Sequence, residues 1–253
     1  MFKKNSLMAY SAGVLFLMSA PGFAEDKSSD NETVIESYSV ELGATRIIYN
    51  PATSGAAVSV SNPNDYPVLV QSAVMTEDKA GKAPFVVTPP LFRLDPKQQS
   101  RLRLVMTGEG AAKDRETLYW MCATGIPPEL GDAWAGEPAE KKKSSASLDV
   151  KIKLSQCIKV LVRPDAVKGK LNDAAPAVTW ARKGDKLEAN NPSPFYINIK
   201  SLDVGGKAVA LPDYIPPFSS RSYAVPKGAG GSVMWTYIND YGGVSRPSEA
   251  KVR

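Results

Sequence analysis

Hydrophobic and polar residues alternate along one long run of the chain, SLDVKIKLSQCIKVLVRP at residues 147–164. The even-numbered positions carry large aliphatic side chains, with Gln156 as their one polar interruption. The odd-numbered positions begin with the charged residues Asp149 and Lys151. A period of two residues predicts a β-strand with one apolar face. This strand would be longer than the ~3–10 residues of most strands.

Shorter runs of the same kind recur along the rest of the chain, bounded by Gly, Pro, Asn and Asp, and no window shows a long amphipathic helix period. Many short strands with turn signals between them predict an all-β protein, built as one large sandwich or two small ones. The expected strands are 34–42, 45–49, 56–61, 67–75, 84–88, 100–106, 116–124, 147–163, 177–182, 186–189, 194–204, 208–211, 221–225, 232–239 and 244–252.

Pro164 follows the long strand and opens a polar segment, PDAVKGKLNDAAP. We therefore expect a first domain at 25–163, a linker at 164–169 and a second domain at 170–253. The polar segment 127–147 separates two expected strands and exceeds the ~12–15 residues beyond which structureless loops are uncommon, which favours a functional loop.

The first 24 residues have the pattern of a secretory signal peptide. Lys3 and Lys4 precede an apolar stretch at 7–20, and small residues follow at positions 22 and 24, the two that a signal peptidase reads. The apolar stretch is shorter than the ~20 residues of a membrane span. We therefore expect residues 25–253 to be exported.

The amino-acid composition argues against several classes of function. The formal net charge of +5 is mild for 253 residues, and the one basic run, at 141–143, reads as a solvated loop, so no nucleic-acid partner is expected. The chain has no histidine, which excludes Ser-His-Asp and Cys-His catalysis and removes the commonest zinc ligand. We expect no catalytic residue, no metal and no cofactor.

Cys122 and Cys157 are the only cysteines. An even count in an exported protein favours one disulfide, and the C-x-x-C spacing of a redox pair is absent. The bridge would join the two cysteine-bearing strands as antiparallel neighbours and leave the other edge of the long strand open.

Seven strings taken together resemble one family, the PapD-like periplasmic chaperones of the chaperone–usher pathway. The resemblance is to the subfamily with a long loop between strands F and G of the first domain, a longer N-terminal strand and a disulfide. It implies two immunoglobulin-like domains set in an L, in the periplasm of a Gram-negative bacterium. Ala123 and Thr124 depart from the family's aliphatic pattern. The strings are LGATRIIYNP, VTPPLFRLDP, DRETLYWMCATGIPP, IKVLVRP, NPSPFYIN, PPFSS and NDYGG.

The same resemblance implies a function. Such a chaperone binds, folds and caps fimbrial or other surface-fibre subunits by lending them a strand, and delivers them to an outer-membrane usher. An exposed apolar strand also favours self-association of the free protein. The lent side chains would be Leu148, Val150, Ile152 and Leu154, flanked by Ala146 and Val160.

Two sets of charged residues gain roles only through the resemblance. Arg46 and Lys159 would grip the C-terminal carboxylate of the subunit. Glu116, Arg163 and Asp240 would form a charge network that sets the angle between the domains. From the residues alone, these are outward-facing strand residues and separate surface charges, and the alternating face is one that packs on its own core.

Two other functions compete with the chaperone. A structural or adhesive sandwich protein, such as a fibre subunit, would be a single domain with an alternating N-terminal extension, for which residues 25–42 are a weak match. A hydrolase with a Ser-Lys pair would need Ser155 and Lys159 to meet, which two residues on one strand cannot do usefully. We therefore expect a binding protein and no enzyme.

Overall fold

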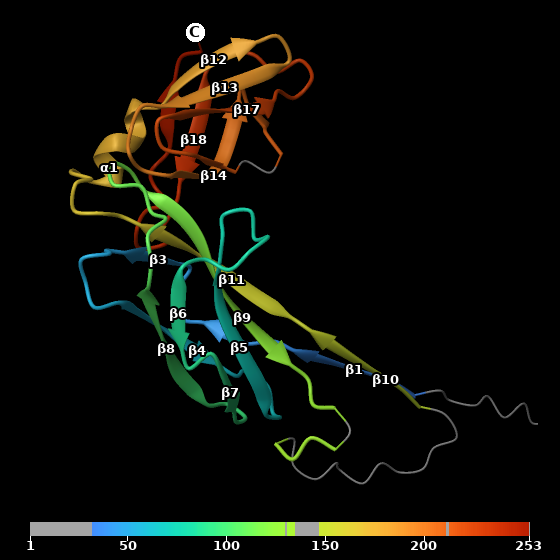
Figure 1. Ribbon diagram of the computed structural model, residues 1–253. Coiled ribbons are helices and arrows are strands. Elements are labelled where there is room, and N and C mark those ends of the chain that lie inside the picture. Colours follow the sequence, from blue (N-terminus) through green and yellow to red (C-terminus); the bar gives the residue numbers. More distant parts are fainter. Residues whose placement is uncertain (1–31, 130, 135–146, 211–212, 253) are drawn as a thin grey trace, which may run out of the picture.

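The computed structural model describes residues 32–129, 131–134, 147–210 and 213–252. Two β-sandwich domains follow one another along the chain and join at an angle (Figure 1). The described helices are short and lie in the polar segment after Pro164: α1 (Leu171–Ala174) and the 3-10 turn η1 (Ala175–Ala177). The all-β prediction is confirmed. The expected signal peptide lies outside the described residues.

The first domain packs two sheets on each other, and their inward-facing residues form a core that includes Val60, Leu102 and Val160, each 0% exposed. Alternating burial along the strands reflects the two-residue period seen in the sequence. One sheet has the order β3 (Arg46–Tyr49), β11 (Ser155–Val162), β9 (Thr117–Ile126), β5 (Val68–Met75) and β7 (Leu91–Leu94); the other has β2 (Glu41–Leu42), β4 (Ala56–Ser61), β8 (Gln99–Met106) and β6 (Phe85–Thr88).

The second domain repeats this plan around a core that contains Trp180 and Trp235. β16 (Tyr214–Ile215) pairs with β14 beside the main sheet. The two sheets are β12 (Thr179–Lys183), β13 (Lys186–Asn191) and β17 (Ser219–Ala224), and β15 (Lys207–Ala208), β14 (Ile197–Val204), β18 (Val233–Tyr237) and β19 (Ser248–Ala250). Hence most expected strands exist. The short strands β7 and β16 were missed because prolines next to them hide the strand pattern.

Both domains use a buried asparagine to close the turn after an Asn-Pro dipeptide. The Asn62 amide nitrogen donates to the carbonyl of Tyr66 at 2.7 Å, and that of Asn191 donates to the carbonyl of Phe195 at 2.7 Å. These bonds satisfy backbone groups that would otherwise be buried without partners. The turn at Asn191 places the start of β14 against the first domain.

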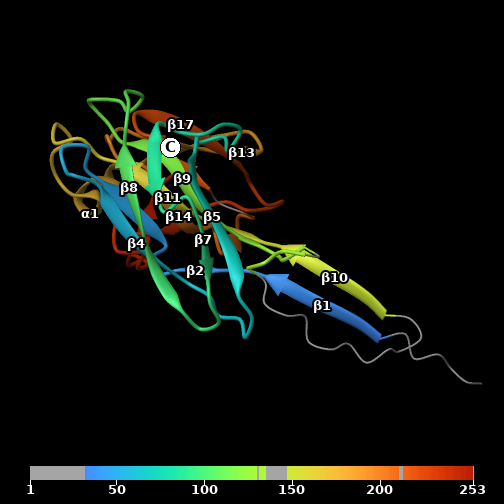
Figure 2. The ribbon, with the colours of Figure 1, turned by 60° about the horizontal axis from the view of Figure 1, so that its bottom comes forward.

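The single strand expected at 147–163 is wrong in one respect, because the structure divides it at Leu154. β11 lies inside the first domain, whereas β10 (Ser147–Lys153) leaves it and pairs in parallel with β1 (Glu32–Tyr38). The strand expected at 34–42 is likewise divided into β1 and β2. β1 and β10 form a two-stranded ribbon that projects from the body of the molecule (Figures 1 and 2).

Hydrogen bonding changes partners at the division. The Leu154 amide donates to the carbonyl of Tyr38 at 3.2 Å, and the Leu154 carbonyl accepts from Gly125 at 3.0 Å. A Cβ on Gly125 would lie 2.3 Å from the Tyr38 carbonyl oxygen, so only glycine allows β1 to approach β9 this closely. Gln156, the polar interruption in the alternation, accepts a hydrogen bond from the Leu42 amide at 2.7 Å.

Candidate functional site

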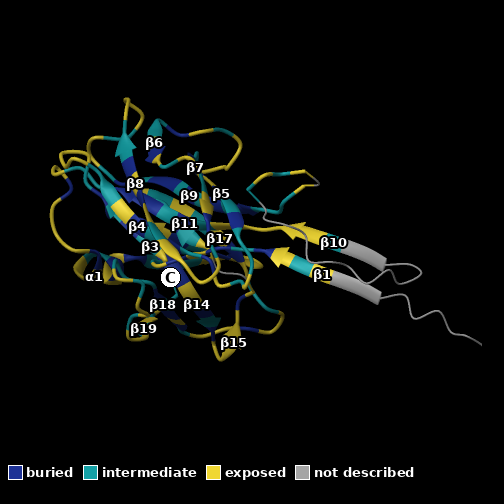
Figure 3. Cartoon of the chain, turned by 90° about the horizontal axis from the view of Figure 1, so that it is seen from below, coloured by how far each residue is buried: buried dark blue, intermediate teal, exposed yellow. Residues whose placement is uncertain are grey.

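The apolar face of the segment 147–162 is exposed at Ile152 and Leu154 and buried from Ile158 on. Ile152 and Leu154 are 41% and 42% exposed, whereas Ile158 and Val160 are 5% and 0% exposed in the first-domain core. Val150 is half-buried. Figure 3 shows the exposed ribbon beside the buried strands of the body. Ile152 and Leu154 therefore do not serve the protein's own core.

Three further residues of the expected donor set have different outcomes. Leu148 lies on β10, but its side chain is outside the described part, and Ala146 is outside it altogether. Val160 is buried in β11, so it does not extend the exposed set.

The expected open edge of the strand is only partly present, because β1 occupies one edge of β10. Among the described residues no strand pairs with the other edge. β1 also adds an apolar side chain to the ribbon, since Ile35 is 65% exposed. The sequence pattern of 34–42 showed an extended segment, but pairing between strands so distant in sequence was not readable from it.

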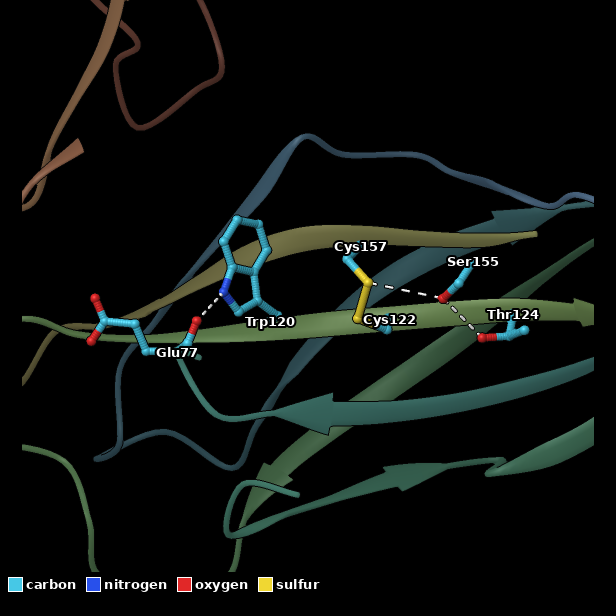
Figure 4. Close-up of a disulfide and its surroundings, with 6 residues drawn as sticks. All are labelled: Glu77, Trp120, Cys122, Thr124, Ser155 and Cys157. Carbon is cyan, nitrogen blue, oxygen red and sulfur yellow. Dashed lines mark hydrogen bonds between the residues drawn. A yellow bond between two sulfur atoms is a disulfide. The ribbon is translucent and has the colours of Figure 1, made fainter. Parts of the chain in front are cut away.

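The disulfide prediction is confirmed. Cys122 on β9 and Cys157 on β11 face each other in antiparallel register and are bonded, with their Cα atoms 4.1 Å apart (Figure 4). Beyond the bridge, Thr124 donates to the hydroxyl of Ser155 at 2.9 Å. These contacts fasten β11 to β9 directly after the chain enters the domain from the projecting ribbon.

Arg46 and Lys159 lie side by side where the two domains meet. They are paired residues of the parallel strands β3 and β11. The Lys159 ammonium donates to the Oδ1 atom of Asn198 at 2.5 Å, and Arg46 Nη1 donates to the carbonyl of Ile238 at 3.3 Å. Both cations therefore extend from the first domain toward the second.

This pair of cations is poorly compensated. Arg46 Nε is buried without a hydrogen-bond partner, and no described acidic side chain forms an ion pair with either cation. Burial lowers the pKa of Arg46 even though Asp240 and Glu116 act to raise it, and burial lowers the pKa of Lys159 to about 8. The charges acting on the Lys159 pKa are Asp213, which raises it, and Arg46, Arg221 and Lys79, which lower it. Such a site is suited to an anion.

Three residues around Lys159 were not predicted as site residues. Asn198 is 3% exposed and ends the string NPSPFYIN, so it was present in a recognised motif without a role. The rings of Tyr214 and Trp120 flank the ammonium, with centroids 4.6 Å and 5.6 Å from its nitrogen. Tyr214 stands outside the recognised strings, and nothing in its local sequence pointed to the site.

The structure brings Glu116, Arg163 and Asp240 together between the domains. Arg163 Nε donates to Glu116 Oε1 at 2.7 Å, and its two terminal nitrogens donate to the Asp240 carboxylate at 2.8 Å each. Glu116 Oε2 accepts from the Tyr196 amide at 2.7 Å, and the Glu116 amide donates to the Pro194 carbonyl at 2.9 Å. Glu116 thus bonds to the second domain through both its side chain and its backbone.

This network is buried beside an apolar contact between the domains. The Glu116 side chain is 1% exposed. Burial raises the pKa of Glu116 even though Arg163 acts to lower it. Leu118, Leu161 and Tyr196 form a small buried cluster next to it.

Comparison with known families gives matches over both domains. Residues 39–168 match the pili and flagellar-assembly chaperone, PapD N-terminal domain, and residues 173–249 match the pili assembly chaperone PapD, C-terminal domain. The chain is 53% identical over 221 residues to chaperone protein AfaB of Escherichia coli, covering 87% of this chain and 86% of the relative. It is 46% identical over 255 residues to chaperone protein PsaB of Yersinia pestis, covering 95% and 93%.

Solved structures resemble most of the chain, over both domains. The E. coli chaperone DraB has a TM-score of 0.77 at 51% identity, covering 88% of this chain and 100% of that one. A chain from the Salmonella enterica complex of SafA pilin with the SafB chaperone has a TM-score of 0.78 at 45% identity, covering 87% and 99%.

The buried network allows a prediction about stability. Arg163→Ala leaves the Glu116 carboxylate buried without its cation, so we expect urea unfolding at neutral pH to show a loss of ~3–5 kcal/mol. Because burial holds the pKa of Glu116 above its unfolded value, the native variant takes up a proton readily, and the loss should shrink as the pH is lowered.

The matched control is Arg93→Ala. Arg93 pairs with Asp95 while both side chains are 44% exposed, so its removal should cost less than ~1 kcal/mol. Equal losses in the two variants would contradict the assignment of Glu116 as a buried charge held by Arg163.

Proposed function

The chain belongs to the PapD family of pilus-assembly chaperones, and we propose that it works in the periplasm by lending β10 to fimbrial or adhesin subunits. It is an assembly chaperone and not an enzyme. The subunit receives the strand in place of one that its own sandwich lacks, and is then passed to an outer-membrane usher. A role as a fibre subunit is not favoured, because both chaperone domains are present.

The exposed face of β10 supports the strand donation. A donated strand gives affinity through its backbone and specificity through alternate side chains that fill pockets. Full burial of a Leu, Ile or Val side chain is favourable by ~1.5–3 kcal/mol, so Val150, Ile152 and Leu154 can contribute appreciably once a partner covers them. The ordering and rigid-body costs of binding offset part of this gain. The complex can therefore be stable and still be exchanged for a permanent strand.

The single observation that carries the proposal is the pair of cations at the base of this strand. β10 continues through Leu154 into β11, where Lys159 lies beside Arg46 with no anion paired to either among the described residues. A subunit strand running parallel to β10 would bring its C-terminal carboxylate to this point. Charge-assisted hydrogen bonds would then hold the carboxylate and define the register, which a slip of one residue would destroy.

The charge network and the exposed apolar side chains have supporting roles in the proposed function. The Glu116–Arg163–Asp240 network sets the orientation of the second domain, and with it the position of Asn198 against Lys159. The exposed side chains of Ile35, Ile152 and Leu154 favour self-association of the free chaperone, since it would cover them until a subunit arrives.

The carboxylate role predicts that Arg46→Ala and Lys159→Ala fold normally but retain subunits poorly. Truncating one partner of a buried charge pair costs ~2–5 kcal/mol, so we expect affinity for a pilin-type subunit to fall by about 30-fold or more. Co-purification after periplasmic co-expression, with native mass measurement, reports the complex. Lys200→Ala, which removes an exposed lysine of β14, is the control. Wild-type yield with the Lys159 variant would disprove the anchor.

The donated face predicts a separate set of effects. Ile152→Asn and Leu154→Asn should change the stability of the free protein by no more than about 0.5 kcal/mol, because both residues are exposed. Each should weaken subunit binding about tenfold or more through lost apolar burial. Lys153→Asn, on the opposite face of the same strand, should leave binding unchanged. Equal effects of all three in a pull-down titration would argue against donation of this face.

The pH dependence of binding follows from Lys159. Its ammonium must be protonated to hold a carboxylate, and binding raises the Lys159 pKa from its free value of about 8. Affinity should therefore be complete at lower pH and decline as the pH rises through about 8. Dissociation constants measured across this range test the prediction. In Lys159→Arg the decline should disappear, because arginine stays protonated; a decline that persists would place the titrating group elsewhere.

A further inference from the structure

Glu77 lies in the turn between β5 and β6 and contacts residues from both domains. Its carboxylate accepts a hydrogen bond from the Tyr214 hydroxyl at 2.7 Å and one from the Tyr196 hydroxyl at 3.3 Å, and both tyrosines belong to the second domain. Its backbone carbonyl accepts from the indole nitrogen of Trp120 in the first domain at 2.9 Å (Figure 4). One residue thus bonds to aromatic side chains on both sides of the domain junction.

Two of these rings are the ones that flank Lys159. The ammonium nitrogen lies 4.6 Å from the Tyr214 centroid and 5.6 Å from the Trp120 centroid, both within the ~6 Å range of cation–π attraction. Tyr196 packs edge-on against Tyr214, with centroids 5.4 Å apart. The rings therefore act together with the Asn198 hydrogen bond to set where the ammonium lies.

The hydrogen bonds from the two tyrosines to Glu77 persist at physiological pH because both phenols stay protonated. The Tyr214 hydroxyl donates to the carboxylate at 2.7 Å, close to the length of a charge-assisted hydrogen bond, which is stronger than one between neutral groups; the Tyr196 contact is longer, at 3.3 Å. Burial, together with the hydrogen bond to Glu77, raises the pKa of Tyr214 to about 12 and raises that of Tyr196 as well. Both phenols remain donors at physiological pH, so Glu77 keeps its hold on the rings.

We infer that Glu77 is a positioning residue of the anion site, which orients the rings on either side of Lys159 and thereby fixes the ammonium for a carboxylate. The inference rests on the proposed carboxylate-binding role of Lys159. The turn that holds Glu77 lies outside all seven sequence strings that carry the family resemblance, and none of its residues belongs to the Glu116–Arg163–Asp240 network. The inference therefore gives this turn a function.

Whether carboxylate binding weakens or strengthens when Glu77 is removed shows whether Glu77 acts by positioning the rings or only through its charge. If Glu77 acted only through its charge, its removal near an anion site would strengthen carboxylate binding. If it acts by holding the rings, Glu77→Ala weakens binding despite the loss of a negative charge. Tyr214→Phe, which removes one hydroxyl and no charge, then acts in the same direction. The double variant should lose little more than either single one, because the two groups share one interaction.

The experiment uses a peptide of alternating apolar and polar residues with a free C-terminal carboxylate, and the same peptide with a C-terminal amide. Both are titrated against the full chain. We expect carboxylate binding to weaken several-fold in Glu77→Ala and Tyr214→Phe, and amide binding to be unchanged. Asp78→Asn is the control, because it removes a neighbouring charge yet keeps an acceptor for its bonds to Thr76 and Ala80.

A second measurement needs no peptide. The rings shift the NMR resonances of the Lys159 ε-methylene, and these should move toward those of an exposed lysine in Glu77→Ala but not in Asp78→Asn. Lys159 resonances that do not move, or carboxylate binding that is equal or tighter in Glu77→Ala, would overturn the inference. If the wild type instead binds both peptides equally, the proposed anchor fails, and the Lys159 resonances still decide the role of Glu77.

Discussion

The burial of the Glu116 carboxylate is the constraint on which the rest of this molecule depends. A carboxylate that is 1% exposed needs a cation and hydrogen-bond donors, and here Arg163 and the Tyr196 amide supply them. Because these partners lie in different domains, the bonds that satisfy one charge also connect the two domains. The facing position of Asn198 and Lys159, and the contact of the Tyr214 ring with that lysine, join the two domains in this arrangement.

The segment 147–162 illustrates how one strand serves two purposes. Its second half is a central strand of the first domain, fastened by the disulfide and by neighbours on both edges. Its first half leaves the domain, and Ile152 and Leu154 remain exposed. A firmly held base allows the projecting half to present a defined register to a partner. The division of the strand at Leu154 depends on Gly125, since no other residue allows β1 and β9 to meet so closely.

Two features of the site are energetically unfavourable in the free molecule. Apolar side chains remain exposed on the ribbon, and two cations lie together where burial disfavours their charge. An incoming strand that ends in a carboxylate would relieve both costs at once. Such a partner would gain binding energy by covering these apolar side chains and by compensating these charges.

The sequence by itself determined the all-β fold class, most strands, the single disulfide and the alternating face, because these follow from period, composition and cysteine count. Ordered motifs also indicated Arg46, Lys159 and the three charged residues, but no local pattern could show that they meet. Tertiary structure alone decided the division at Leu154, the pairing of β1 with β10, and the contacts of Tyr214 and Glu77 around Lys159. Each of these joins residues far apart in the chain, and long-range pairing and desolvation depend on the packed domains, not on the residues next to them.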